Sequence, residues 1–372
     1  MKIRQRVICT LILTIIISLV LLHGCSDASD KTISESTINP TVSSIDDSDY
    51  RIVFQSVRDA PFASSDYQAN YQRYFDLYIM SENGSNVRRI TDNLYWENQP
   101  DISPDGQKIL FGFHEFEDSV GPVEGIHPGW EIAVMDIDGL SIQKLTNNDY
   151  MEFMPDWNHD GTKIVYMADA NQRSAQDIAD GLAPQYHIFT LDADGSNVVQ
   201  LTFGDNPGYV NGDPSFSLGE PSKIVYIHTE DFADGGDLYT MDADGQNQQL
   251  ILECDDELLK INDPTFSPDG NKIIFGAMVR EDQYGNPIYN LFTMNTSSEN
   301  LTSITEDDGE ADILAQYSPD GSKICYMTWA WNGPGIGDFR IRLANANGSD
   351  EKVISSFQWE QAPAWVPIIE IE

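Results

Sequence analysis

The chain has 372 residues, and its 60 acidic side chains outnumber its 21 basic ones, which gives a formal net charge of −39. Nucleic-acid binding depends on Lys and Arg neutralising phosphates, so this charge excludes nucleic acid as an expected partner. It also disfavours anionic membrane surfaces and polyanionic substrates. Hydrophobic residues make up 41% of the chain, so the sequence predicts a folded protein with a sizeable core.

The first 25 residues read as an export signal rather than as part of the fold. Three basic residues within the first six positions precede an uncharged, predominantly apolar run over 7–22, which is the pattern of a secretory signal. The run ends in Leu-His-Gly-Cys, which resembles a lipobox except for the His. We therefore expect residues 1–24 to be a signal peptide and Cys25 to carry a lipid. The alternative is an uncleaved single-span anchor, because the run is close to the length of a span.

Residues 25–49 are rich in Ser, Thr and Asp and poor in apolar side chains. This composition predicts a flexible tether. Residues 50–372 then form the folded domain. Both interpretations of the N-terminus place this domain outside the cytoplasmic membrane, at a periplasmic or cell-surface location.

The rest of the chain repeats one unit. Its first half contains a Pro, a Ser-Pro-Asp-Gly turn and a short β-type run, as in 100–111. Its second half contains another strand, an Asp-x-Asp-Gly turn and a further strand, as in 188–202. Gly at these turns supplies the positive φ that a hairpin needs, and Asp caps the turn backbone. The first halves of the later units start at Pro155, Pro214, Pro264 and, with Pro replaced, Ala315.

Units of four strands that repeat at the spacing of these starting residues are typical of propeller blades. The N-terminal stretch 51–54 matches the second strand of a unit that lacks its first strand, and 363–365 near the C-terminus matches that missing strand. A blade built from both termini closes the ring and removes its open edges. We therefore predict an all-β, six-bladed β-propeller with four antiparallel strands per blade and one composite blade.

The repeated Ser-Pro-Asp-Gly-x-Lys-Ile unit followed by Met-Asp-x-Asp-Gly resembles the TolB-like (WD40-like) β-propeller repeat over about residues 50–367. The resemblance implies an exported propeller. It is less specific for function, because similar repeats occur in TolB proteins, in the propellers of prolyl-oligopeptidase-type peptidases and in oligogalacturonate lyases.

Candidate ligand-binding residues lie where one blade crosses to the next. At the position three residues before the aligned Pro or its substitute, four of the six units have an acidic residue, and aromatic residues lie nearby. Such a ring at the channel mouth would hold Ca²⁺ or a cationic side chain, although ordinary solvated carboxylates are the alternative. The candidates are Glu97, Glu152, Asn211, Asp312 and Glu360, with Trp96, Tyr150 and Trp359.

Long inserts between the second and third strands should share the face that carries the functional loops. Two tryptophans of one insert form either an exposed platform or a cover over the neighbouring blade. Histidines flanking the inserts could bind a metal together with the carboxylates. These insert-face candidates are His114, His127, His187, His228, Trp329 and Trp331.

The sequence contains no Gly-x-Ser-x-Gly nucleophile motif. We therefore expect a non-catalytic, monomeric protein without a cofactor, Ca²⁺ being the open alternative. Its acidic, aromatic loop face would bind a protein, a peptide or a glycan. The competing hypothesis is a metal-dependent, lyase-like carbohydrate-active enzyme that uses the insert histidines.

Overall fold

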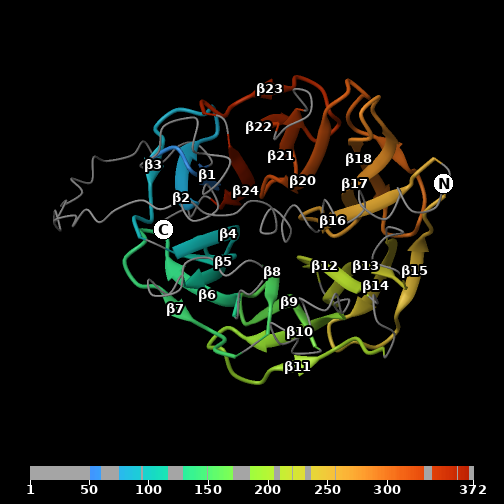
Figure 1. The fold of residues 1–372 in the computed structure, drawn as a ribbon. Helices are drawn as coiled ribbons and strands as arrows, with labels where there is room; N and C mark the ends of the chain where they lie inside the picture. The colour runs from blue at the N-terminus through green and yellow to red at the C-terminus, as the bar shows by residue number, and fades with distance from the viewer. Residues whose placement is uncertain are drawn as a thin grey trace.

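The computed structural model shows a ring of radially arranged β-sheets (Figure 1). We find no helix in the described ranges that has the length and hydropathy to cross a bilayer. The residues that the structure describes are 51–59, 75–93, 95–115, 129–148, 150–170, 185–204, 210–219, 221–230, 236–255, 257–330, 337–357 and 359–367.

Within these ranges the strands form six four-stranded antiparallel units, the blades of the ring. Blade 1 contains β24 (Glu360–Val366), β1 (Arg51–Ser56), β2 (Asp76–Ser81) and β3 (Arg88–Arg89). Blade 2 contains β4 (Tyr95–Ile102), β5 (Lys108–Glu115), β6 (Glu131–Asp136) and β7 (Gln143–Lys144). Blade 3 contains β8 (Glu152–Trp157), β9 (Lys163–Asp169), β10 (Tyr186–Asp192) and β11 (Val199–Gln200).

Blade 4 contains β12 (Val210–Phe216), β13 (Lys223–Thr229), β14 (Asp237–Asp242) and β15 (Gln249–Leu252). Blade 5 contains β16 (Lys260–Phe266), β17 (Lys272–Glu281), β18 (Pro287–Asn295) and β19 (Thr302–Ser303). Blade 6 contains β20 (Ala311–Tyr317), β21 (Lys323–Ala330), β22 (Asp338–Asn345) and β23 (Lys352–Val353). Blades 3 and 4 also share one parallel residue pair, Tyr186 and Val210.

The composite blade closes the ring as predicted. Strand β24 pairs antiparallel with β1, with Ile52 opposite Trp365 and Val53 opposite Ala364. In Figure 1 the dark red β24 lies beside the blue β1, although the two strands come from opposite ends of the domain. This pairing satisfies the edge of β1 that would otherwise be open.

Each Ser-Pro-Asp-Gly turn is held by its own side chains. In blade 2 the hydroxyl of Ser103 donates to Asp105 at 2.6 Å and accepts the backbone N–H of Lys108 at 2.9 Å. The hydrogen bond from Ser103 lowers the pKa of Asp105 below its usual value. Gly106 occupies the turn with φ of 64°. The motif is therefore a hairpin, and its polar residues are used locally.

Every inner strand carries a β-bulge at the position before the aligned Pro or its substitute. Six residues there have φ between 47° and 53°, and in all six blades the register to the second strand shifts at that point. The bulge turns the strand, so consecutive residues face the ring axis. These six residues are Gln99, Met154, Asp213, Asp263, Leu314 and Ala362.

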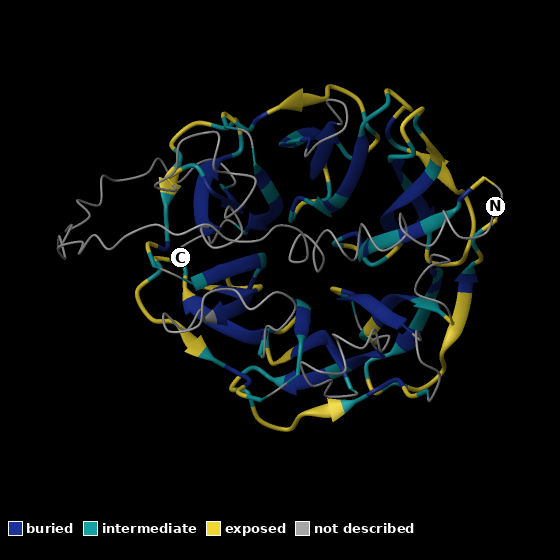
Figure 2. Ribbon diagram, viewed as in Figure 1, coloured by how far each residue is buried: buried dark blue, intermediate teal, exposed yellow. Residues whose placement is uncertain are grey.

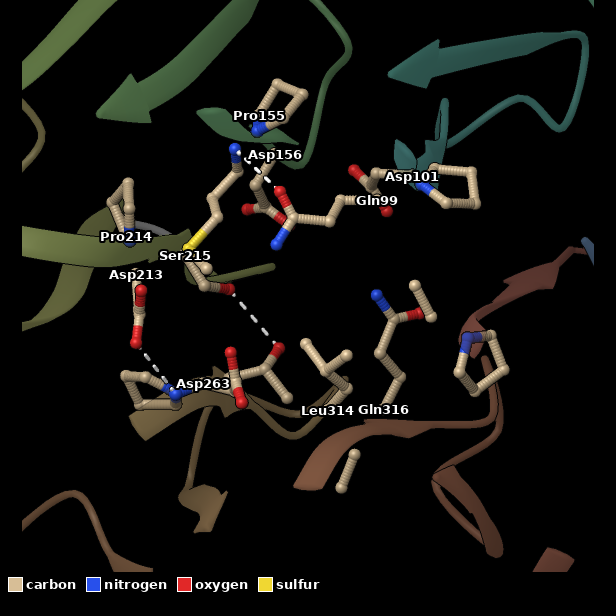
Figure 3. Close-up of a pocket in the computed structure, with 17 residues that line it drawn as sticks. Gln99, Asp101, Pro155, Asp156, Asp213, Pro214, Ser215, Asp263, Leu314 and Gln316 are labelled. Atoms are coloured by element: carbon tan, nitrogen blue, oxygen red, sulfur yellow. Dashed lines mark hydrogen bonds between the residues drawn. The ribbon is translucent and has the colours of Figure 1, made fainter. Parts of the chain in front are cut away.

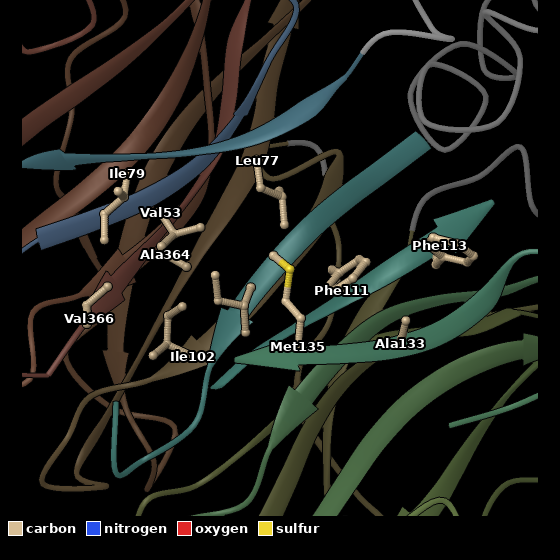
Figure 4. Packing of buried hydrophobic residues seen from close by; sticks show 11 residues of the cluster. Val53, Leu77, Ile79, Ile102, Phe111, Phe113, Ala133, Met135, Ala364 and Val366 are labelled. Atoms are coloured by element: carbon tan, nitrogen blue, oxygen red, sulfur yellow. The ribbon is translucent and has the colours of Figure 1, made fainter. Parts of the chain in front are cut away.

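The core is divided into clusters that join residues of neighbouring blades, and the strands that contribute to them are coloured as buried in Figure 2. Between blades 1 and 2, Val53, Leu77 and Ala364 pack against Phe111 and Met135 (Figure 4). Sheets that pack face to face through such layers hold each blade against its neighbour. The ring is therefore stabilised by burial at each blade interface.

Candidate functional site

A cavity of about 100 Å³ lies on the ring axis. Its wall contains residues from the inner strand of all six blades, centred on the bulge (Figure 3). The polar wall residues are Gln99, Asp101, Asp156, Asp213, Ser215, Asp263, Thr265 and Gln316.

Each wall carboxylate ties its blade to the next one. Asp101 accepts the backbone N–H of Trp157 at 2.9 Å, and Asp156 accepts that of Phe216 at 2.6 Å. Asp213 accepts the backbone N–H of Asp263 at 3.1 Å. These bonds run from the inner strand of one blade to the inner strand of the next, so the acids join neighbouring blades beside the axis.

The four acids form two neighbouring pairs of like charge. Burial raises the pKa of Asp101 and of Asp213 to about 6, against their backbone hydrogen bonds. Burial, followed by the charge of Asp101, raises the pKa of Asp156 well above its usual value. Burial and the charge of Asp213 do the same for Asp263. The cavity therefore favours positive charge or protons.

The predicted ring of acids is placed differently from our expectation. Glu97 and Glu152 are at most 1% exposed and lie between blades, not at an open mouth. Glu97 accepts the hydroxyl of Thr91 at 3.1 Å and the amide of Asn93 at 2.6 Å. Glu152 is bonded in the same way to Thr146 and Asn148.

We call this arrangement, a Thr or Ser at the end of one blade with a polar residue on the next inner strand, a blade clasp. Its hydroxyl also accepts a backbone N–H of the third strand, as Thr91 does from Leu77 at 2.9 Å. Burial raises the pKa of Glu97 to about 8 and that of Glu152 to about 7. We expected Glu97 and Glu152 to be accessible at the channel mouth. The structure instead buries both, with their carboxyl groups hydrogen-bonded in the clasp.

The remaining ring candidates are also buried. Asp312 is 2% exposed and accepts the hydroxyl of Thr328 at 2.7 Å. Glu360 is buried, forms an ion pair with Arg58 and accepts the backbone N–H of Ser356. The contact of Asp312 lies within blade 6, whereas that of Glu360 with Ser356 lies at the junction of blades 6 and 1.

Asn211 replaces the acid at the junction of blades 3 and 4, where two predicted histidines meet it. Its amide oxygen lies 3.0 Å from Nδ1 of His228, and its Nδ2 lies 3.4 Å from Nδ1 of His187. Burial lowers the pKa of His228 below its usual value. The two histidines are therefore brought together, but in a buried junction.

His114 lies apart from them and stacks on Trp130 with ring centroids 5.3 Å apart. Trp96 is buried beside the same Trp130. Trp329 is 4% exposed and stacks on Phe339 at 4.9 Å, so it covers its own blade instead of forming an exposed platform.

Trp359 is half-buried against Phe339, and Tyr150 is also half-buried. Cys25, His127 and Trp331 lie outside the described residues, as do residues 1–50 with their signal and tether.

Sequence reasoning missed the cavity acids, although their signal is present. An Asp directly precedes or follows the aligned Pro in four of the six units. The alignment on Pro was therefore correct. The register along the inner strand was not, because the bulge directs the residues next to Pro toward the axis and leaves the earlier positions between blades.

Fold and site together define a closed β-propeller with a carboxylate-lined axial cavity. A family model for the TolB β-propeller domain matches residues 124–370, more than half of the chain. The chain belongs to this family.

Individual relatives agree with this assignment. The chain is 26% identical over 208 residues, 54% of its length, to an uncharacterized protein, Atu1656, of Agrobacterium fabrum. It is 33% identical over 104 residues, 28% of its length, to the Tol-Pal system protein TolB of Alcanivorax borkumensis. The matches cover 60% and 22% of those two proteins.

Among solved structures, TolB from Acinetobacter baumannii superposes with a TM-score of 0.60 at 16% identity. That match covers 86% of this chain and 67% of the other. At this identity the likeness shows the fold alone.

Proposed function

We propose that this protein is an exported, non-catalytic propeller that binds a protein, a peptide or a glycan through its acidic insert face. The observation that carries the proposal is the membership in the TolB β-propeller family together with a net charge of −39. A rigid ring presenting variable loops is suited to recognition, and its charge favours a basic partner.

The placement of the histidines supports binding over metal-dependent catalysis. His187 and His228 contact Asn211 inside a blade junction, and His114 stacks on Trp130. Over the described part of the chain, no three His, Cys, Asp or Glu side chains are grouped so that they could hold a metal ion. Of the carboxylates that suggested Ca²⁺, Glu97 and Glu152 are engaged in blade clasps. Asp312 accepts the hydroxyl of Thr328, and Glu360 is paired with Arg58. We therefore propose binding without a cofactor.

The proposed location is the outer side of the cytoplasmic membrane, where a lipid on Cys25 anchors the protein. We propose that the anchored protein is a monomer. Replacing the thiol by Cys25→Ser removes the acylation site. We expect the variant to leave the membrane fraction, while the wild-type chain stays there with the mass of an acylated N-terminus. A variant that remains membrane-bound would favour the single-span anchor.

The binding role is tested with full-length protein and peptides of matched length and opposite charge. We expect basic peptides to bind and acidic ones not to, with an affinity that falls as salt screens the charges. The insert variant Glu115→Gln, Glu117→Gln, Asp118→Asn should weaken binding. The matched variant Asp138→Asn, Asp194→Asn, Asp244→Asn changes the charge equally at hairpin turns and should not. Equal effects of both variants would contradict the insert face as the binding site.

A further inference from the structure

We propose that the axial cavity is a binding site for one primary alkylammonium group. This site is separate from the insert face and does not depend on the partner proposed there. The same chemistry is carried by the side chain of a lysine and by a small free amine, and the experiment below distinguishes these sources.

The first argument is uncompensated charge. Asp101, Asp156, Asp213 and Asp263 line one cavity, and none of the described residues in its wall is Lys, Arg or His. Carboxylates that are close together attract a cation, and the attraction is strongest at Asp213, because it is buried while the other three are partly exposed to water. The wall thus offers these acids no positive side chain as a partner.

The second argument is a carboxylate oxygen without a hydrogen bond. Asp213 is only 4% exposed, and its Oδ2 accepts the backbone N–H of Asp263 at 3.1 Å. Its Oδ1 is buried and has no partner. Leaving such an acceptor unpaired costs on the order of 1–3 kcal/mol, and more for a charged group. A donor that enters the cavity would remove this cost.

An ammonium group fits the acceptors of the wall. It has three N–H donors and no acceptor, so it can bond to several oxygens of Asp213 and its neighbours at once. The unpaired Nε2 of Gln99 is a donor and contributes nothing to this binding. The apolar wall residues Pro100, Pro264 and Leu314 offer contacts for a methylene stem.

Geometry favours an ammonium over a metal ion. The cavity, with a volume of about 100 Å³, has room for several water molecules and therefore for an ammonium on a short stem. Ca²⁺ needs 6–8 oxygen ligands, whereas no trio of carboxylates within the described ranges is arranged around a metal position.

The test uses full-length protein at neutral pH and calorimetric titration with ethylammonium. We expect saturable binding of one equivalent, and none of tetramethylammonium, which has the charge but no N–H. Asp213→Asn keeps an oxygen for the N–H of Asp263 but removes the charge, so ethylammonium should bind about tenfold more weakly or worse. The control Asp244→Asn removes an exposed turn carboxylate and should change nothing.

Titration with Nα-acetyl-lysine methylamide then identifies the source. If it binds like ethylammonium, the cavity accepts a lysine side chain; if only ethylammonium binds, the ligand is a small free amine. A thermal melt of each variant shows that the ring is intact. The proposal is overturned if ethylammonium does not saturate, if folded Asp213→Asn binds it as wild type does, or if Ca²⁺ occupies the cavity and excludes it.

Discussion

The hydroxyl of Thr91 donates to the buried carboxyl group of Glu97 at 3.1 Å, across the junction of blades 1 and 2. Its oxygen also accepts the backbone N–H of Leu77 at 2.9 Å. Thr91 ends one blade, and Glu97 lies on the inner strand of the next. One hydroxyl therefore satisfies a strand N–H and a buried acid together, and it joins the two blades.

Thr91→Val should destabilise the protein by about 1–3 kcal/mol, because the isosteric side chain leaves the buried N–H of Leu77 unpaired and leaves Glu97 with its bond to Asn93 alone. Thr91→Ser keeps the hydroxyl and should cost less. The midpoint of urea unfolding measures both. Equal losses for Val and Ser would show that packing of the methyl group, not the clasp, stabilises this junction.

Stability should fall as pH rises from about 4 to about 8. Burial raises the pKa of Asp76, Glu152 and Asp312 to about 7, and that of Glu97 to about 8. The same groups in the unfolded chain titrate near pH 4. Below that pH both states are protonated and the stabilisation is complete; above it the unfolded chain loses protons first, so folding becomes less favourable.

Unfolding midpoints at pH 5, 6, 7 and 8 measure this slope. Self-repulsion of the acidic chain acts in the same direction, so Glu97→Gln serves as the control. Its neutral amide removes one raised group and should flatten the slope between pH 5 and 8. Stability that increases over this interval would contradict the protonated clasp.

Gly84→Ala should destabilise the ring more than Gly309→Ala. Both glycines have positive φ, 80° and 90°, so both substitutions carry a backbone strain of about 1–3 kcal/mol. At Gly84 the new Cβ would also lie 2.1 Å from the carbonyl oxygen of Ile354 in the adjacent blade, while nothing lies within 4 Å at Gly309. The difference between the two unfolding free energies isolates the blade contact, and no difference would mean that the turn can move away.

Ending the chain after Ser356 should abolish cooperative folding. The truncation removes β24, whose Ala364 packs with Val53 and whose pairing covers the edge of β1. Without it the ring is open and exposes an apolar edge. A chain ending after Pro367 keeps all of β24 and is the control. Thermal melts and size-exclusion chromatography should show aggregation of the shorter chain only; a monomeric, cooperative melt of that chain would refute closure as the source of stability.

Much of the fold followed from local signals. The Ser-Pro-Asp-Gly and Asp-x-Asp-Gly turns are read from residues next to each other, and the hydrogen bonds of Ser103 and Asp105 are made within the same turn. The match of 363–365 to the missing first strand predicted the pairing of β24 with β1. Such features depend on few neighbours, so one sequence is enough to recognise them.

The site was less predictable because it depends on a single backbone feature. Glu97 and Asp101 are four positions apart on β4, yet one is buried in a blade clasp and the other lines the axis. The bulge at Gln99, with φ of 48°, lies between them and changes the face on which the following residues lie. The alternation of polar and apolar residues does not reveal this bulge, although a shift of one residue exchanges the two faces of a strand.

The sequence alone determined the repeat, the hairpin turns, the composite blade and the excess of acidic over basic side chains, because periodicity and charge are properties of the chain itself. Which acids join blades and which face the cavity was decided only by the closed ring. Burial and the pairing of like charges arise between residues some fifty positions apart, such as Asp213 and Asp263, and they exist only after six sheets have met around one axis.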